Sequence, residues 1–399
     1  TVYVMADIDM SPACSEELEI SWEPIGTFAG TFDGNYHKLS NLYFNSDNFN
    51  EYIGLFTQNN GIIQNLILDN VNIYAYKTGQ NQSIYLGGIV GANGGKIINC
   101  GVNTGIIIGN NVELTASTWV PIGSGGITGD NSGKISNCYN RANIQAISAD
   151  KKYKQAHTGG IAGFNYSIIE NSYNSGEIIS NGNDNFNGGI CGFTCNVDNA
   201  MIINSYNIGN ITTIGSRTNY EGGIVGLNGE RSNPAIVQIT NSYCGTNTTY
   251  SQTYWNGSNY IPTTEGRIDP TEDLKTYAPI LGSAYENDDF NINEGYPILW
   301  WQAPTIELNK KQAYIKTGEN LQLEIVQNED LPNALVGKTN ITDFNWSSTN
   351  DDVATVNGNG LVTGLKEGYT TIYGKHKEYE NVNVMCIINV AKAENIALP

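Results

Sequence analysis

The sequence predicts an all-β protein: a right-handed parallel β-solenoid (β-helix) followed by a small β-sandwich. Three observations predict this fold class. A five-residue pattern recurs through the first part of the 399-residue chain, each repeat contains only short β-type runs, and the last quarter changes to alternating strands. No helical period of about 3.6 residues is sustained between residues 20 and 260.

The recurring pattern is Gly-Gly-Ile-x-Gly, followed in each repeat by a segment that contains Ile, Asn and then Cys or Ser. Its five copies are GGIVG at 87–91, GGITG at 125–129, GGIAG at 159–163, GGICG at 188–192 and GGIVG at 222–226. A degenerate copy, IGLF, stands at 53–56, and the second glycines are separated by 34, 38, 34, 29 and 34 residues. This period is typical of stacked units that bury their apolar faces against their neighbours.

Each repeat contains three short apolar runs bounded by Gly or Asn, which is a strand length and too short for a helix. Asn-Gly pairs such as Asn93-Gly94 supply the positive φ that tight corners need. We therefore expect three strands per coil, over about 20–255. The recurring Asn should form a hydrogen-bonded ladder at a corner. The Ile after each Gly pair should form an interior column: Ile89, Ile127, Ile161, Ile190 and Ile224.

Cysteine usage disfavours a disulfide framework or a zinc site, because the seven cysteines are odd in number and lack ligand-like spacing. Cys100 and Cys138 occupy the same repeat position and should lie on adjacent coils. We expect two small buried apolar side chains there, with a disulfide as the alternative.

The chain carries a net charge of −19, and residues 1–302 hold 27 acidic against 12 basic side chains. This balance disfavours nucleic acids and anionic membranes as partners. No apolar stretch approaches the ~18 residues that a membrane span requires, so we expect no membrane insertion. The sequence starts at Thr1 without a signal peptide. We expect an excised segment of an extracellular protein, secreted or on the cell surface, whose export signal and anchor lie outside it.

Sequence motifs for catalysis are absent, including HExxH, GxSxG and a Walker loop, and the only histidines are His37, His157 and His376. Acidic pairs such as Asp7 and Asp9 lack companions at calcium-loop spacing. We therefore expect no catalytic residues, no cofactor and no metal.

One column of residues is a candidate ligand site. The variable insert of each repeat ends just before the Gly pair, so the inserts should share one edge of the solenoid. The residues two before each first glycine are Tyr85, Gly123, His157, Phe186 and Tyr220, with Trp119 in a neighbouring insert. Exposed rows of such rings stack on sugars, and the acidic balance favours neutral glycans. The alternative is that the rings only pack against one another.

The N-terminal two thirds resembles the GLUG-motif β-solenoids of bacterial surface proteins. The resemblance rests on YVMADIDMS at 3–11, WEPIG at 22–26, FAGTFDGNYHKLSNLYF at 28–44 and the Gly-Gly-Ile repeats. A similar closing segment is NINEGYPILW at 291–300. We expect a solenoid domain over 1–302, with Trp300 and Trp301 covering its last open coil.

From residue 303 the sequence alternates as an antiparallel sandwich does. FNWSSTNDDVATVNGNGLVTGLKEGYTTI at 344–372 resembles the bacterial Ig-like domain, group 2. The resemblance implies an Ig-like domain over 303–393, with Trp346 in its core, that serves as an extracellular spacer or adhesion module. Residues 394–399 would be a linker to a missing downstream region.

Together these features favour a non-catalytic, monomeric scaffold for adhesion and binding, with a spacer attached. Its partner would be a neutral glycan or a host or cell-surface protein. Two alternatives stay open. One is a carbohydrate-active β-solenoid enzyme, a polysaccharide lyase or hydrolase, which would need a groove of clustered Asp, Lys and Arg. The other is an accessory region of a surface peptidase.

Overall fold

The chain divides into two compact units, Thr1–Tyr285 and Glu286–Pro399. The computed structural model describes residues 1–47, 49–77, 82–111, 120–148, 154–194, 200–215, 218–229, 237–245, 248–256, 258–265, 274–303, 306–327, 335–379 and 382–392.

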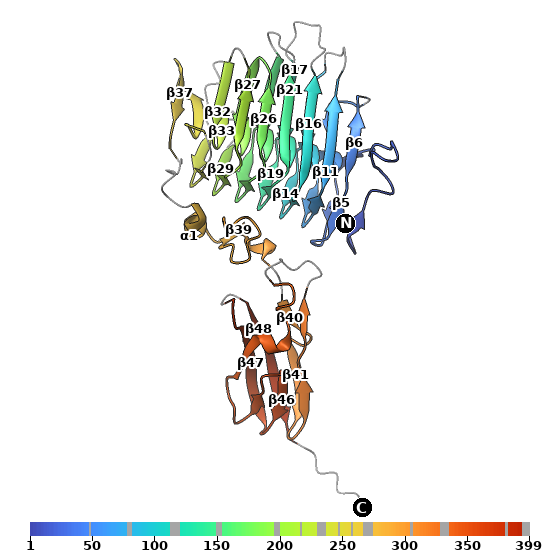
Figure 1. The fold of residues 1–399 in the computed structure, drawn as a ribbon, viewed down its shortest axis with the longest axis vertical. Coiled ribbons are helices and arrows are strands. Elements are labelled where there is room, and N and C mark those ends of the chain that lie inside the picture. The colour runs from blue at the N-terminus through green and yellow to red at the C-terminus, as the bar shows by residue number, and fades with distance from the viewer. Residues whose placement is uncertain are drawn as a thin grey trace, which may run out of the picture. The chain divides into compact units, whose positions relative to one another are not determined.

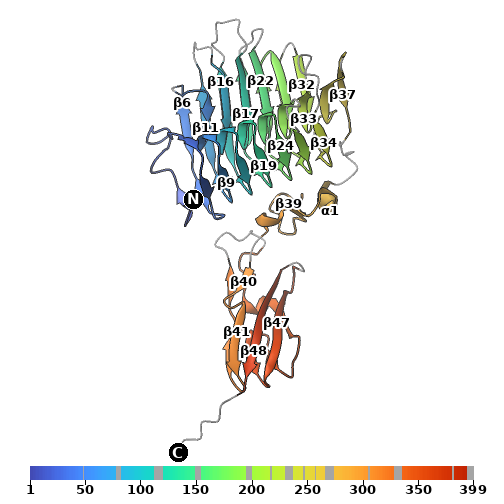
Figure 2. The ribbon, with the colours of Figure 1, turned by 180° about the vertical axis from the view of Figure 1, so that it is seen from behind.

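The first unit is a parallel β-solenoid in which five sheets run along the stack of coils (Figures 1 and 2). The first sheet contains β1 (Val2–Tyr3), β4 (Thr31–Asp33), β9 (Ile62–Gln64), β14 (Lys96–Ile98), β19 (Lys134–Ser136), β24 (Ile168–Glu170), β29 (Met201–Ile203) and β34 (Gln238–Thr240). The second contains β2 (Ile8–Asp9), β5 (Lys38–Ser40), β10 (Ile67–Asp69), β15 (Gly101–Val102), β20 (Tyr139–Asn140), β25 (Tyr173–Asn174), β30 (Tyr206–Asn207) and β35 (Tyr243–Cys244).

The other three sheets complete each coil. The third contains β6 (Tyr43–Ser46), β11 (Val71–Tyr76), β16 (Gly105–Asn111), β21 (Asn143–Ser148), β26 (Ile178–Asn181) and β31 (Ile211–Ile214). The fourth contains β7 (Tyr52–Ile53), β12 (Ile84–Gly87), β17 (Val120–Gly125), β22 (Lys154–Gly159), β27 (Asp184–Gly188) and β32 (Thr218–Gly222). The fifth contains β3 (Ile25–Phe28), β8 (Phe56–Asn59), β13 (Val90–Asn93), β18 (Thr128–Asn131), β23 (Ala162–Asn165), β28 (Cys191–Thr194), β33 (Val225–Asn228), β36 (Gln252–Trp255) and the antiparallel β37 (Tyr260–Thr263).

In the described residues each complete coil therefore has five strands, and the expectation of three is wrong. Two corners divide the runs further. The Gly pair separates the fourth sheet from the fifth, and an Asn at positive φ, such as Asn137 at 54°, separates the first from the second. The solenoid also starts earlier than residue 20, because Val2 of β1 pairs with Phe32 of β4.

The interior column of isoleucines is confirmed. The side chains of Ile89, Ile127, Ile161, Ile190 and Ile224 are at most 1% exposed. Neighbouring coils are joined there by backbone bonds such as Ile127 N–H to Ile161 O at 3.0 Å. The second glycine of each pair is required by the close approach of the next coil, since a Cβ on Gly126 would lie 2.2 Å from Asn140 Cγ.

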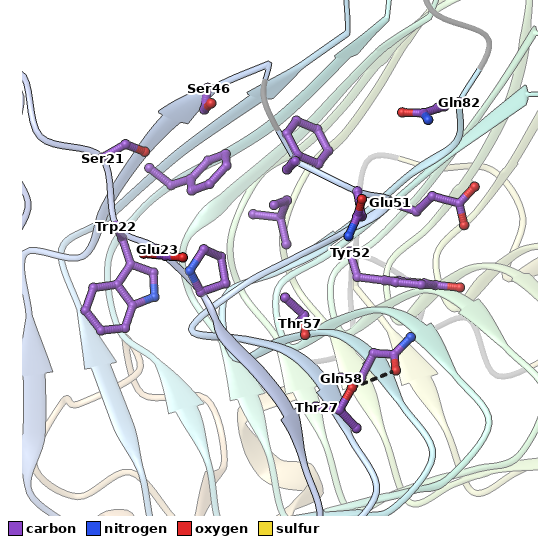
Figure 3. Close-up of a pocket in the computed structure, with 15 residues that line it drawn as sticks. Ser21, Trp22, Glu23, Thr27, Ser46, Glu51, Tyr52, Thr57, Gln58 and Gln82 are labelled. Carbon is purple, nitrogen blue, oxygen red and sulfur yellow. Dashed lines mark hydrogen bonds between the residues drawn. The ribbon is translucent and has the colours of Figure 1, made fainter.

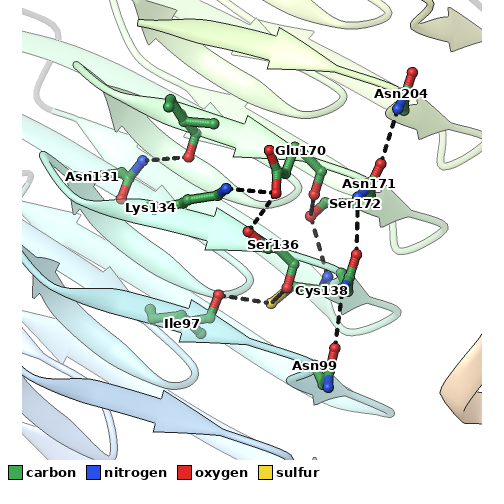
Figure 4. Close-up of polar contacts among 12 residues, drawn as sticks. Ile97, Asn99, Asn131, Lys134, Ser136, Cys138, Glu170, Asn171, Ser172 and Asn204 are labelled. Carbon is green, nitrogen blue, oxygen red and sulfur yellow. Dashed lines mark hydrogen bonds and ion pairs between the residues drawn. The ribbon is translucent and has the colours of Figure 1, made fainter. Parts of the chain in front are cut away.

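The corner asparagines form the expected ladder (Figure 4). Asn137 Nδ2 donates to Asn99 Oδ1 at 3.1 Å, and Asn171 Nδ2 donates to Asn137 Oδ1 at 3.0 Å. Every member of the ladder has positive φ, between 48° and 54°: Asn65, Asn99, Asn137, Asn171, Asn204 and Asn241. Asn adopts this conformation more readily than other non-glycine residues because its short side chain can hydrogen-bond locally.

Cys100 and Cys138 are both free, fully buried and part of the solenoid core. They contact carbonyl oxygens, such as Ile97 O at 3.7 Å from Cys138 Sγ (Figure 4). They therefore act as small apolar side chains.

Residues 274–285 pack against the last coils of the solenoid. This segment contains η1 (Leu274–Tyr277) and α1 (Ala278–Leu281), and β38 (Tyr285–Glu286) follows it. Asn241 Nδ2 donates to Ile280 O at 2.6 Å, and Tyr285 Oη donates to Asn204 O at 2.9 Å. Trp300 and Trp301, which we expected in this role, belong to the second unit, where the side chain of Trp300 is 47% exposed.

In the second unit, β39 (Ile298–Leu299) and η2 (Trp300–Gln302) are followed by a β-sandwich. One sheet has the order β41 (Gln312–Lys316), β48 (Asn383–Ala391), β47 (Gly368–His376) and β44 (Phe344–Ser348). Another has the order β42 (Asn320–Gln322), β46 (Leu361–Gly364) and β45 (Ala354–Val356). The remaining elements are the antiparallel pair β40 (Ile306–Leu308) and β43 (Ile325–Gln327), and η3 (Ile341–Asp343).

Phe344 is among the largest fully buried side chains of the sandwich core, with 1% exposed. Trp346, which we expected in the core, is only half-buried at its margin, where its Nε1 donates to Ile341 O at 2.9 Å. Phe290 and Ile292 precede the predicted boundary at residue 303, yet both pack against this core.

Candidate binding site between the fourth and fifth sheets

The predicted aromatic column lies on the fourth sheet of the solenoid. Its members pair directly on successive coils, in the order Tyr52, Tyr85, Gly123, His157, Phe186 and Tyr220. Tyr52 was not expected. Tyr52 precedes the degenerate copy of the repeat. It pairs with Tyr85, and Phe56 pairs with Val90. The segment from Tyr52 to Phe56 is therefore one residue shorter than the segment from Tyr85 to Val90, and this deletion brings Tyr52 into register. A repeat alignment that allows this deletion would have found it.

A second column on the fifth sheet faces the first, because the chain bends sharply at each Gly pair. Its members are, in order, Thr27, Gln58, Ala92, Asp130, Phe164, Phe193 and Leu227. The ring centroid of Phe164 lies 5.7 Å from Tyr85 and 4.2 Å from His157. Phe164 also fills the space above Gly123, whose added Cβ would lie 2.7 Å from Phe164 Cδ2. We call the surface between the two columns the aromatic groove.

Rings fill the central part of the aromatic groove. His157 is 2% exposed, Phe186 6% and Phe164 1%. The rings of His157 and Phe186 stack with their centroids 4.4 Å apart and an angle of 5° between their planes. Mutual packing, the alternative interpretation, therefore describes these central residues, which present no open ring face to a ligand. Tyr85 and Tyr220 are half-buried, and Trp119 lies outside the described residues.

His157 is a neutral ring in this setting. Burial lowers its pKa to about 3, because a charged imidazolium would lose its hydration. Its Nε2 lies 3.1 Å from Gln155 Oε1, and its Nδ1 has no hydrogen-bond partner among the described residues. His157 therefore contributes packing to the groove.

Asp130 is the acid of the aromatic groove. Burial raises its pKa to about 6, although the hydroxyl of Ser132, 3.3 Å away, donates to its Oδ1. Burial also raises the pKa of Tyr85 to about 12, and the negative charge of Asp130 adds to that rise. An uncharged Asp130 is thus accessible at mildly acid pH.

The groove opens into a cleft at its N-terminal end. The third and fourth sheets start one coil later than the other three sheets, so β6 and β7 have no strand before them. A cavity of about 790 Å³ occupies this place (Figure 3). We call it the N-terminal cleft; it is lined by Ser21, Trp22, Glu23, Pro24, Thr27, Phe44, Ser46, Phe49, Asn50, Glu51, Tyr52, Ile53, Thr57, Gln58 and Gln82.

Two aromatic side chains lie on opposite sides of the view in Figure 3. Tyr52 is the last ring of the column and stacks on Tyr85, with ring centroids 5.4 Å apart and an angle of 22° between the planes. Trp22 is fixed by a hydrogen bond from its Nε1 to Leu55 O at 3.2 Å. Below Tyr52 in this view, Thr27 Oγ1 donates to Gln58 Oε1 at 3.2 Å.

A buried lysine holds one wall of the cleft in place. Lys77 is 3% exposed, and its ammonium group donates to Asp47 O at 3.1 Å and to Phe49 O. The same group lies 3.9 Å from the centre of the Phe49 ring, a cation–π contact. Burial lowers the pKa of Lys77. The positive charge of Lys77 is thus already hydrogen-bonded to the backbone around Phe49. The sequence analysis did not identify this role.

The charges that face the cleft are negative. Glu23 and Glu51 line it, and no Lys, Arg or His is among its described lining residues. The described residues contain no group of three or more His, Cys, Asp or Glu arranged to hold a metal ion. Within the same residues, no helix has the length and apolar character needed to cross a membrane.

Comparison with known proteins identifies the second unit. No curated protein matches the chain. A family model matches residues 303–383, and that family is the bacterial Ig-like domain (group 2). A parallel β-solenoid is therefore followed by a group 2 bacterial Ig-like domain in this chain.

Proposed function

We propose that this chain is a non-catalytic segment of a secreted or cell-surface bacterial protein. In this proposal the solenoid binds a neutral glycan and the Ig-like domain acts as a spacer. The N-terminal cleft is the observation that carries it: a hollow with aromatic and polar walls on a rigid stack of coils. Such concave sites with a few convergent polar groups are typical of ligand binding.

Two further observations support an adhesive role outside the cell. The group 2 Ig-like match at 303–383 is typical of bacterial surface proteins. The N-terminal motifs, from WEPIG at 22–26 to the Gly-Gly-Ile repeats, resemble GLUG-motif surface solenoids. A neutral ligand fits the net charge of −19 and the carboxylates of the cleft, which repel anions.

A glycan array tests this function directly. The whole chain, residues 1–399, is applied to an array of neutral oligosaccharides and their sialylated counterparts. We expect retention of neutral glycans, and weaker retention of the sialylated ones. If the whole chain retains no neutral glycan at high protein concentration, the glycan-binding proposal is wrong and a plain spacer replaces it.

A carbohydrate-active enzyme is the second candidate, and Asp130 favours it. An acid whose pKa is about 6 resembles a general acid, and Glu51 lines the adjoining cleft. We nevertheless propose binding without cleavage, because the lining includes no Lys or Arg among its described residues. Incubation with the retained glycan, followed by measurement of new reducing ends or unsaturated uronates, distinguishes the two. Product release would establish the enzyme. The flanking sequence of the full-length protein tests the peptidase alternative.

A further inference from the structure

We infer that the N-terminal cleft binds the terminal ring of a neutral glycan, which stacks on the outer face of Tyr52 and extends the aromatic column by one position. This inference rests on the proposed function and names the site and its mode of binding. It moves the contact away from the column residues predicted from the sequence, because the central ones are covered.

The vacant position follows from the sheet order. Apart from Gly123, the column consists of rings at the spacing of the coils, and successive stacked rings lie 4.4 to 5.4 Å apart. The fourth sheet ends at β7, so no strand of the described residues supplies a ring beyond Tyr52. The fifth sheet continues for one more strand, β3, which places Thr27 beside the vacant position. The cleft therefore lies where a further strand of the fourth sheet would have stood in the first coil.

The walls of the cleft match a ring that carries hydroxyl groups. Tyr52 and Trp22 offer flat apolar surfaces, which the C–H faces of a sugar can cover. Glu51, Gln58 and Gln82 offer carboxylate and amide groups that accept hydrogen bonds from hydroxyls or donate to them. A purely apolar ligand would bury these polar groups without partners.

The charges exclude an anionic terminal residue. Glu23 and Glu51 face the cleft, and the nearest buried cation, Lys77, is bonded to the carbonyl oxygens of Asp47 and Phe49. A carboxylate or sulfate on the ligand would meet like charges and no described counter-charge. A neutral sugar meets hydrogen-bond acceptors instead.

The shape restricts binding to a chain end. Beyond Tyr85 the groove is filled by Phe164, His157 and Phe186, which are at most 6% exposed. A polysaccharide cannot run along the groove through these rings. The volume of about 790 Å³ lies within the range of small-ligand sites, about 300–1,000 Å³.

The experiment compares ring-deleted variants at the two ends of the column in the whole chain. The probe is whichever neutral oligosaccharide the array retains, titrated by calorimetry together with its sialylated counterpart. Tyr52→Ala should lower the affinity at least tenfold, and Tyr52→Phe should keep it within about twofold, because the ring is retained. Tyr220→Ala, a half-buried tyrosine at the other end, is the matched control and should bind as the parent does.

A second variant distinguishes a loss of binding from a loss of folding. Gln58→Leu keeps the side-chain volume and leaves the ring column intact, and it should also weaken binding at least fivefold with an unchanged melting temperature. If the whole chain binds but Tyr52→Ala and Gln58→Leu bind as well as the parent, the cleft is not the site although the proposed function stands. Equal affinity for the sialylated counterpart would overturn the charge argument. A chain that binds no neutral glycan would overturn the proposed function itself.

Discussion

The two units place tyrosine side chains in different environments. In the solenoid, Tyr139, Tyr173 and Tyr206 pair on successive coils, stack 5.4 and 5.0 Å apart, and are at most 3% exposed. In the sandwich, Tyr314 and Tyr369 stand on the outer face of the four-stranded sheet and are 72% and 70% exposed. The same residue type is thus buried in one unit and solvated in the other.

The difference comes from repetition. In a solenoid each side chain has a counterpart one coil away on both sides, so a row of identical residues covers itself. In a sandwich the core forms between two different sheets, and strands that pair can be far apart in sequence, as β41 and β48 are. A change in the solenoid should therefore disturb a column, whereas a change in the sandwich should disturb one core.

The largest effect is expected at the centre of the isoleucine column. Ile161→Asp places an unpaired charge where the native side chain is 0% exposed, which costs about 4 kcal/mol or more. Thermal unfolding of the first unit should shift strongly or disappear. Ile214→Asp, at a position 52% exposed, is the control and should change little. An unaltered melting temperature for Ile161→Asp would contradict the column.

The sandwich should respond at Phe344 more than at Trp346. Phe344→Ala should cost about 3–5 kcal/mol because it removes a fully buried ring. Trp346→Ala should cost less, since this side chain is half-buried at the core margin. Denaturant unfolding of the second unit measures both. A larger loss for Trp346→Ala would mean that the tryptophan, as first expected, belongs to the core.

Two substitutions at a corner asparagine distinguish the cost of positive φ from the loss of the ladder hydrogen bonds. Asn137→Ala should cost about 2–4 kcal/mol, since it places alanine at a φ of 54° and removes both ladder bonds. Asn137→Gly removes only the bonds and should recover part of this loss. Thermal unfolding of the two variants gives the comparison. Equal stability of the Gly and Ala variants would show that positive φ imposes no cost here.

The boundary of the sandwich can be sharpened by truncation. Residues 286–399 should unfold cooperatively and be more stable than residues 303–399 by about 2 kcal/mol. The longer segment retains Phe290, which is 8% exposed and packs in the core. Calorimetry of both segments measures the difference. Equal stability would place the boundary back at residue 303.

The smallest expected effect is a gain. The pKa of Asp130 rises from 3.8 to about 6 on folding, so the folded state holds a proton that the unfolded state has released between these pH values. The stability from this group is fully present below about pH 4 and is lost as pH rises through 6. Asp130→Asn should therefore stabilise the first unit by about 1–3 kcal/mol at pH 7. The gain should vanish near pH 3.5.

The stability of the parent must be compared with that of the Asp130→Asn variant at each pH, because His157 also titrates. Its pKa falls to about 3 on folding, so its contribution to stability changes with pH in the opposite direction to that of Asp130. Stability from His157 is lost as pH falls below about 6.5. Melting curves of parent and Asp130→Asn over pH 3.5–7.5 cancel this contribution. A difference that does not change with pH would contradict the raised pKa of the half-buried Asp130.

The repeat spacing was enough to predict the solenoid, because each coil depends only on its neighbours and the pattern is local. Ile161 and Asn137 were placed correctly for that reason. The number of strands per coil was not predictable from run lengths, because the corners at Gly126 and Asn137 divide runs that look continuous.

The candidate site shows the same division. The sequence determined by itself that rings recur at one position in most coils, since their offset from the Gly pair is fixed. Only the tertiary structure decided which rings are open. Phe164 folds over Gly123 from the facing sheet and buries His157, while Tyr52 lines a cleft because the fourth sheet lacks a strand in the first coil. Burial depends on contacts between different sheets and on where each sheet ends, and neither quantity is encoded in the period of the repeat.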